Sequence, residues 1–147
     1  MEIVINSSPL ILLSGIGRLH LLNRMYSKVY IPHAVLDEVD GINLSPVSFS
    51  PMQISNRELV LKMLGGLHLG EVEIIVGAVE NGIQDVVLDD NAARNKARKL
   101  GLSVTGTLGI LRMARNMGLI SNLEEEVTKL RTNGMYLTDE LVKRILS

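Results

Sequence analysis

The sequence contains no cysteine and no tryptophan, and aromatic residues make up only 3% of its 147 residues. Without cysteine there is no disulfide, no zinc–thiolate site and no thiol nucleophile. The scarcity of aromatic side chains argues against the stacking platforms on which many proteins bind single-stranded nucleic acids. The lack of cysteine also suits a reducing compartment, so we expect a cytoplasmic protein.

Long apolar runs are absent as well, and none reaches the length that spans a membrane. The first residues have an acid, Glu2, where a secretory signal peptide would carry basic residues, so we expect no such signal. Hydrophobic residues make up 46% and charged residues 21%, which is typical of a globular chain. We therefore expect one domain over residues 1–147, long enough to bury a core.

The net charge of −1 excludes neither a nucleic acid nor an acidic partner, but the charges are unevenly distributed. Between Asn91 and Asn122 there is no acidic residue, whereas acids gather just upstream, up to Asp89 and Asp90. The basic residues in this segment are Arg94, Lys96, Arg98, Lys99, Arg112 and Arg115. An acidic cluster beside a basic one suits a cation next to a phosphate backbone, although on charge alone a solvated basic helix face is the simpler interpretation.

Short, continuous apolar runs alternate with segments of helical periodicity. The runs predict strands at residues 2–5, 28–32, 85–88 and 102–106. Helices are expected at residues 7–14, 19–26, 33–40, 55–64, 71–81, 90–100, 107–118, 123–134 and 137–147, with an irregular stretch at 41–53. Apolar strands separated by helices predict an α/β protein, a three-layer α/β/α sandwich around a central parallel sheet of about four to five strands.

In such a sheet, functional groups gather beyond the carboxyl ends of the strands. The segment "VVLDDNAARNKARKLG" places Asp89 and Asp90 at one strand end, where a basic helix begins. Together with Glu38 and Glu71, these acids form a candidate site for Mg²⁺ or Mn²⁺, which prefer oxygen ligands. For any one of these acids a structural role is the simpler interpretation, since Glu71 and Asp90 begin helices, where acids complement the helix dipole.

Other chemistries are poorly supported. The "SGIGRL" segment lacks the third glycine of a dinucleotide fingerprint, and there is no P-loop. The serines lack a histidine and aspartate partner set for acyl transfer. His20, His33 and His68 lie apart without metal-ligand spacing, so core or surface roles are expected for them.

Several segments resemble, in order, a PIN-like family of prokaryotic nucleic-acid-binding proteins. They are "VINSSPLILLSGIGRLHLL", "VYIPHAVLDEV", "LHLGEVEIIVGA", "VVLDDNAARNKARKLGLSVTGTLGILRMARNMGLI" and "MYLTDELVKRIL". The resemblance covers nearly the whole chain, and "LDDNAAR" and "GTLGIL" are its most specific parts. It implies the PIN fold and Mg²⁺- or Mn²⁺-dependent phosphodiester hydrolysis. Because PIN proteins include toxin ribonucleases of toxin–antitoxin pairs, it also implies RNA as substrate, an antitoxin partner and a homodimer.

The resemblance assigns roles to individual residues. The family's acids fall on Glu38, Glu71 and either Asp89 or Asp90, and the following helix favours Asp90. These positions imply Glu38, Glu71 and Asp90 as catalytic residues, with Asn6 and Asp89 as further metal ligands. The expected nucleic-acid contacts are Ser8, Arg94, Lys96, Arg98, Lys99, Thr105 and Thr107.

Asn6 stands where a PIN domain usually carries its first catalytic aspartate. An amide oxygen can still bind a hard cation, but the site loses one negative charge. Two hypotheses follow from this departure. The chain is a metal-dependent ribonuclease, or it is a weak or inactive PIN fold that binds nucleic acid or protein; an unrelated α/β module is a more distant alternative.

Overall fold

Five parallel strands form one sheet, in the order β3-β2-β1-β4-β5, in the computed structural model, which describes residues 1–147. The strands are β1 (Glu2–Ile5), β2 (Lys28–Pro32), β3 (Ser50–Met52), β4 (Asp85–Val87) and β5 (Ser103–Thr105). The central strand β1 pairs with β2 through Val4 opposite Tyr30, and with β4 through Val4 opposite Val86. This all-parallel sheet, covered by helices, confirms the α/β class that the alternating pattern predicted.

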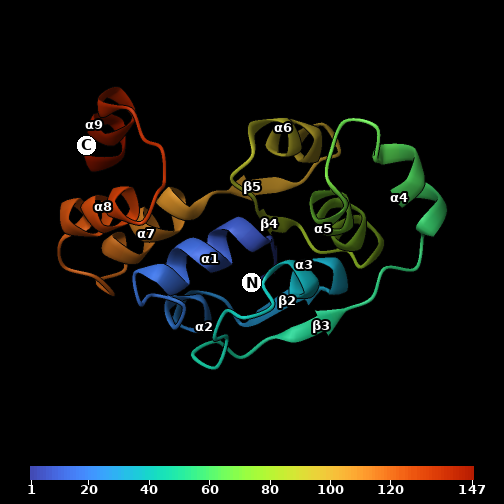
Figure 1. Ribbon diagram of the computed structural model, residues 1–147, viewed down its shortest axis with the longest axis horizontal. Coiled ribbons are helices and arrows are strands. Elements are labelled where there is room, and N and C mark those ends of the chain that lie inside the picture. Colours follow the sequence, from blue (N-terminus) through green and yellow to red (C-terminus); the bar gives the residue numbers. More distant parts are fainter.

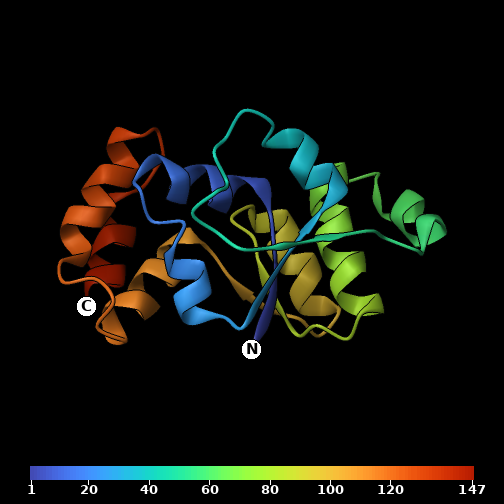
Figure 2. The same cartoon turned by 90° about the horizontal axis from the view of Figure 1, so that it is seen from below.

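Helices cover both faces of the sheet, which makes three layers (Figure 1). The helices are α1 (Ser7–Gly15), α2 (Leu21–Met25), α3 (His33–Glu38), α4 (Arg57–Met63), α5 (Leu69–Glu80), α6 (Asn91–Lys99), α7 (Thr107–Asn116), α8 (Leu123–Thr132) and α9 (Asp139–Leu146). One face carries α1, α2 and α7, with α8 and α9 packed outside them; α5 and α6 lie on the other, with α4 at the periphery (Figures 1 and 2). No helix is long and apolar enough to cross a membrane.

The core lies on both faces of β1, where Ile3, Val4 and Ile5 are fully buried. Burying a side chain of this size contributes about 1.5–3 kcal/mol, so three in succession anchor the centre of the sheet. Helix α5 runs against β1, β2 and β4, and every residue from Gly70 to Ala78 is buried. A helix that is apolar nearly all round belongs in the interior, yet this one includes Glu71 and Glu73.

The fifth strand, β3, lies inside the stretch 41–53 that was expected to be irregular, so that expectation was wrong for residues 50–52. The helices that follow β1 and β5 begin close to the strands. Only Asn6 separates β1 from α1, and only Gly106 separates β5 from α7. The first turns of both helices therefore lie directly at the edge of the sheet.

That edge is kept in register by backbone hydrogen bonds that continue past the strands. The Asn6 amide donates to the Val87 carbonyl at 3.1 Å, and the Leu88 amide donates to the Thr105 carbonyl at 2.9 Å. The residues that follow β1, β4 and β5 consequently lie next to one another. Functional groups from segments distant in sequence meet at this carboxyl edge, as expected for a parallel sheet.

Candidate functional site

The first turn of α1 links two acids on either side of the central strand. The Ser7 hydroxyl donates to Glu38 Oε2 at 2.9 Å, and the Ser8 hydroxyl donates to Asp89 Oδ2 at 3.2 Å. Glu38 ends α3, which follows β2, whereas Asp89 follows β4. Adjacent serines after β1 thus fix one carboxylate from each neighbouring strand.

Asn6, which immediately precedes these two serines, has an unusual environment. Its side chain is buried with 6% exposure, and its Oδ1 atom has no hydrogen-bond partner. A buried polar atom without a partner costs free energy of about 1–3 kcal/mol, so such atoms are rare and call for an explanation. An oxygen of this kind, free to accept, is suited to a cation.

Gly70 provides the space that Glu38 occupies. A Cβ atom at Gly70 would lie 2.0 Å from Glu38 Oε1 and 3.5 Å from Asn6 Oδ1. Any other residue would therefore displace the Glu38 carboxylate, which shares this notch with the free amide oxygen of Asn6. The close approach explains why glycine, a poor helix former, stands as the second residue of α5.

Glu71, the next residue of α5, is a buried carboxylate with 7% exposure. Burial raises its pKa above the ordinary value, opposed by a 3.1 Å hydrogen bond from the His68 amide to Glu71 Oε1. The negative charges of Asp90 and Glu38 raise this pKa further. Glu71 therefore lies within electrostatic reach of both other acids and is repelled by each of them.

The charge of His68 opposes this repulsion in part, but no ion pair neutralises the acids. None of Glu38, Glu71, Asp89 and Asp90 takes part in an ion pair, although six ion pairs occur elsewhere in the chain. No three acidic or histidine side chains converge into a ready-made metal cage. The oxygens available to a cation are instead a looser set around Asn6, in which one donor is an amide.

The two adjacent aspartates have different surroundings. Asp89 accepts hydrogen bonds from the Thr107 amide at 2.8 Å and the Thr107 hydroxyl at 2.7 Å, in addition to Ser8. Asp90 is exposed and uses one oxygen, Oδ2, to cap α6 by accepting from the Ala93 amide at 3.0 Å. Asp90 keeps its other oxygen free and its charge reaches Glu71, whereas Asp89 is occupied in joining β4 to α7.

Arg94 connects this edge to the basic helix α6. Its guanidinium donates to the Leu88 carbonyl at 2.8 Å and lies against Gly106, where a Cβ would come within 2.7 Å of Arg94 Nη1 and 2.9 Å of Asp89 Oδ1. Burial lowers the pKa of Arg94, the charge of Arg98 lowers it further, and Asp89 raises it. The guanidinium is half-buried and has no acidic ion-pair partner, so it can receive an anion.

The structure separates the other expected nucleic-acid contacts. Lys96 and Lys99 line a hollow of about 350 Å³ together with Lys62, on the opposite side of α6 from Arg94. Arg98 is exposed, whereas Thr105 is half-buried and lines a different hollow together with Arg94. Ser8 is half-buried and bonded to Asp89. Thr107 is fully buried, and both its amide and its hydroxyl are used by Asp89, so in this structure it holds that acid instead of meeting a ligand.

Three residues that organise the site were not among the expected site residues. Ser7 orients Glu38, Gly70 leaves space for Glu38, and Gly106 leaves space for the side chains of Arg94 and Asp89. The sequence does contain a hint of the role of the two glycines. Both stand at helix starts, where no tight turn requires a glycine. What each glycine accommodates comes from a distant segment and is visible only in the fold.

Comparison with known proteins agrees with this geometry. Residues 2–147 match a family model that is described as a PIN domain. The chain belongs to the PIN domain family. No curated protein and no solved structure matches it significantly. PIN domains generally use divalent metals and are associated with nucleic acids, and the donor set around Asn6 fits that chemistry.

Proposed function

We propose that this PIN domain is a metal-dependent ribonuclease that hydrolyses phosphodiester bonds at the carboxyl edge of its sheet. The observation that carries the proposal is the free, buried Oδ1 atom of Asn6 at the Gly70 notch, which it shares with the carboxylate of Glu38. The next residue of α5, Glu71, adds a buried carboxylate that is close enough to Glu38 for their charges to interact. A buried acceptor beside uncompensated negative charge is costly unless a cation is bound there. The oxygen-only donors suit Mg²⁺ or Mn²⁺.

The residues proposed to hold the ion are Asn6, Glu38, Glu71 and Asp90, with Asp89 as a neighbour that positions α7. A bound divalent ion would lower the pKa of its water and stabilise charge on the phosphate. Ser7 orients Glu38 through its hydrogen bond, and Gly70 leaves the space that this carboxylate needs. Arg94 supplies positive charge for a phosphate of the strand, a contact that positions the substrate without reading its sequence.

The family resemblance adds expectations about partners. A toxin role would include an antitoxin protein that blocks the site and a homodimer of this domain. Light scattering of the purified chain tests the homodimer, and recovery of an inhibitory protein expressed from the same operon tests the antitoxin.

Asn6→Asp is the decisive variant, because it restores a carboxylate beside Glu38. We expect Mg²⁺- or Mn²⁺-dependent cleavage of single-stranded RNA to rise at least about tenfold, since an added ligand charge increases cation attraction and water activation. Isothermal titration with Mn²⁺ should show tighter binding of the ion. Glu71→Gln should abolish both signals.

Asn122→Asp is the matched control. Asn122 also precedes a helix, α8, and its side chain accepts from the Glu125 amide at 3.0 Å, which an aspartate can do equally well. This control adds the same charge away from the site and should leave cleavage unchanged. If folded Asn6→Asp binds no more metal and cleaves no faster than wild type, the chain has no latent nuclease site. The amide at position 6 then favours the second candidate, a PIN-fold module that binds nucleic acid or protein without cleaving it.

A further inference from the structure

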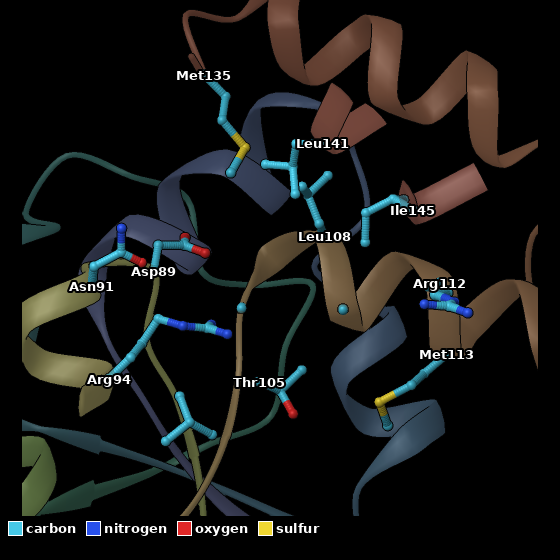
Figure 3. A pocket seen from close by; sticks show the side chains of 13 residues that line it. Asp89, Asn91, Arg94, Thr105, Leu108, Arg112, Met113, Met135, Leu141 and Ile145 are labelled. Carbon is cyan, nitrogen blue, oxygen red and sulfur yellow. The ribbon is translucent and has the colours of Figure 1, made fainter. Parts of the chain in front are cut away.

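A cavity of about 450 Å³ lies beside the carboxylate edge, between the start of α6, strand β5, and helices α7 and α9 (Figure 3). It begins at Asp89 and Asn91, which flank the proposed ligand Asp90 in the chain, and extends away toward the C-terminal helices. The volume is within the range of pockets that bind small organic ligands, about 300–1,000 Å³. Nothing in the proposed chemistry accounts for this cavity.

The charged lining of the cavity consists of two arginines and, at its mouth, one acid, Asp89. Arg94 reaches in from α6 and Arg112 from α7, with the Arg94 side chain extending toward β5 (Figure 3). Neither arginine has an acidic partner within 4.0 Å, whereas Arg18 and Arg57 elsewhere in the chain are paired with acids. Guanidinium groups bind phosphate oxygens in a fork geometry, so two unpaired ones around a hollow favour an anionic ligand.

The remaining wall is apolar and comes from the C-terminal part of the chain. Met135, Leu141 and Ile145 face Leu108 across the hollow in Figure 3. Methionine and leucine side chains offer flat, adaptable contact to a ring, in a chain that has little aromatic surface to offer. A ligand that satisfies the whole cavity therefore combines an anionic group with an apolar, ring-like part.

The two glycines of the motif "GTLGIL", Gly106 and Gly109, shape the wall of the cavity next to the acids. Gly106 lets Arg94 and Asp89 approach the start of α7, as described above, and Gly109 stands one turn later in the cavity wall. A Cβ at Gly109 would lie 2.9 Å from Thr105 Cγ2, so this glycine allows α7 to lie close to β5. The two glycines thus shape the wall that runs from the acids to the apolar end.

We propose that this cavity binds one unstacked nucleotide of the RNA next to the cleaved bond, with its base against Leu108, Met135 and Leu141 and its phosphate on Arg94 and Arg112. The proposal rests on the nuclease function and deepens it by assigning a base-binding subsite. The position of the cavity supports this occupant, because it opens directly from Asp89 beside the carboxylate edge. A partner helix is less suitable, since such helices lay anchors along two turns and need an extended groove.

Binding without catalysis tests the subsite separately from the nuclease. The chain is titrated in EDTA with short single-stranded RNA, either intact or with one abasic position placed at each site in turn. We expect one position at which the abasic oligonucleotide binds about fivefold more weakly, because the missing base no longer buries apolar surface against Leu108, Met135 and Leu141. Arg112→Gln should weaken binding of all oligonucleotides about fivefold and reduce the salt dependence.

Matched controls lie on the same helix or carry the same side chain. Arg115→Gln, one turn along α7 and outside the cavity, should bind RNA as wild type does. Met135→Ala should abolish the discrimination between intact and abasic RNA, whereas Met117→Ala, an exposed methionine outside the cavity, should retain it.

The leucine and isoleucine methyl signals in NMR spectra identify the occupant directly. Shifts of Leu108, Leu141 and Ile145 on addition of a nucleoside monophosphate support the subsite, even if every variant fails to cleave RNA. Equal binding of all abasic and intact oligonucleotides would overturn it. The proposal is likewise wrong if an acidic peptide shifts these methyls and nucleotides do not, because the cavity would then be a protein-docking site.

Discussion

At the scale of single residues, two buried acids on one helix show the difference between a structural charge and a functional one. Glu71 and Glu73 are 7% and 5% exposed, two positions apart on α5. Glu73 accepts from the Ala34 amide at 3.1 Å and from Arg57 at 2.7 Å, so both its oxygens are satisfied and its charge is neutralised. Glu71 receives only one backbone amide and faces two other acids.

This contrast predicts opposite effects of the same substitution. Glu71→Gln keeps an oxygen for the His68 amide and removes the repelling charge, so it should raise the free energy of unfolding in EDTA at pH 7 by about 0.5–2 kcal/mol. Glu73→Gln should lower it by about 1.5–3 kcal/mol, since Arg57 loses its ionised partner. Urea titrations followed by circular dichroism measure both. If Glu71→Gln were destabilising, Glu71 would be a structural acid. The inference that its charge lowers stability in the absence of a bound cation would then be wrong.

The sequence predicts those properties of the site that depend on neighbouring residues in the chain, but not those that depend on contacts with distant segments. The positions of expected strand ends and helices were sufficient to select four candidate acids, Glu38, Glu71, Asp89 and Asp90. The family resemblance added Asn6, because an amide stands there in place of the usual aspartate. The distinct surroundings of Asp89 and Asp90 could not be predicted, because they depend on Ser8 and Thr107 from other strands. Burial of Thr107 likewise depends on how α7 packs, which its own sequence does not reveal.

At the scale of elements, apolar runs and helical periodicity were sufficient for four of the five strands and for the alternation with helices. Strand β3 was missed because it has three residues, includes Pro51 and follows a loop rich in proline and serine. It pairs at the edge of the sheet, where Pro51 is tolerated. A short edge strand of this kind is defined by its pairing with β2, and its own sequence pattern does not reveal it.

Helix α9 is the element that should open most easily. It contains no buried residue, and it is capped by the Thr138 hydroxyl, which accepts from the Leu141 amide at 3.1 Å. Thr138→Ala removes this bond and should cost about 1 kcal/mol in α9 alone. We expect hydrogen exchange, read by mass spectrometry, to become about fivefold faster in residues 139–146 while peptides of the sheet keep their protection.

Thr138→Asp is the control for this prediction, because aspartate also caps a helix and its charge complements the helix dipole. Its exchange in α9 should match wild type. Equal acceleration in the sheet would show that α9 is part of the global folding unit. Because Leu141 and Ile145 line the cavity, a bound nucleotide should also slow exchange in this helix.

At the scale of the whole molecule, one ion pair joins the segment between α1 and α2 to the C-terminal helices. Arg18, in the segment after α1, donates to Glu126 Oε1 on α8 at 2.5 Å, across 108 residues of sequence. Glu126 is buried with 3% exposure, and its Oε2 atom has no partner. The pair therefore positions α8 behind α1 and α7, and indirectly supports the helices that close the cavity.

This connection should make the stability of the fold depend on pH. The Arg18 hydrogen bond lowers the pKa of Glu126 below its ordinary 4.5, against the opposing effect of burial. An acid with a depressed pKa in the folded state stabilises the protein above its ordinary pKa, and this contribution is lost as the pH falls through the folded-state value. Glu126→Gln should therefore lower the free energy of unfolding at pH 7 by about 1.5 kcal/mol, a low value for a charged hydrogen bond because Oε2 is unsatisfied.

The difference between wild type and Glu126→Gln should shrink as the pH falls below 4.5, because wild-type Glu126 then takes up a proton as well. Urea unfolding at several pH values between 7 and 3 measures this convergence. Glu125→Gln is the control, since the exposed Glu125 has only a 3.9 Å contact with Lys129 and should change stability by less than about 0.5 kcal/mol. If the difference in the free energy of unfolding between wild type and Glu126→Gln stays constant from pH 7 to pH 3, the charge of Glu126 does not matter for stability. The ion pair with Arg18 would then not be what holds α8 in place.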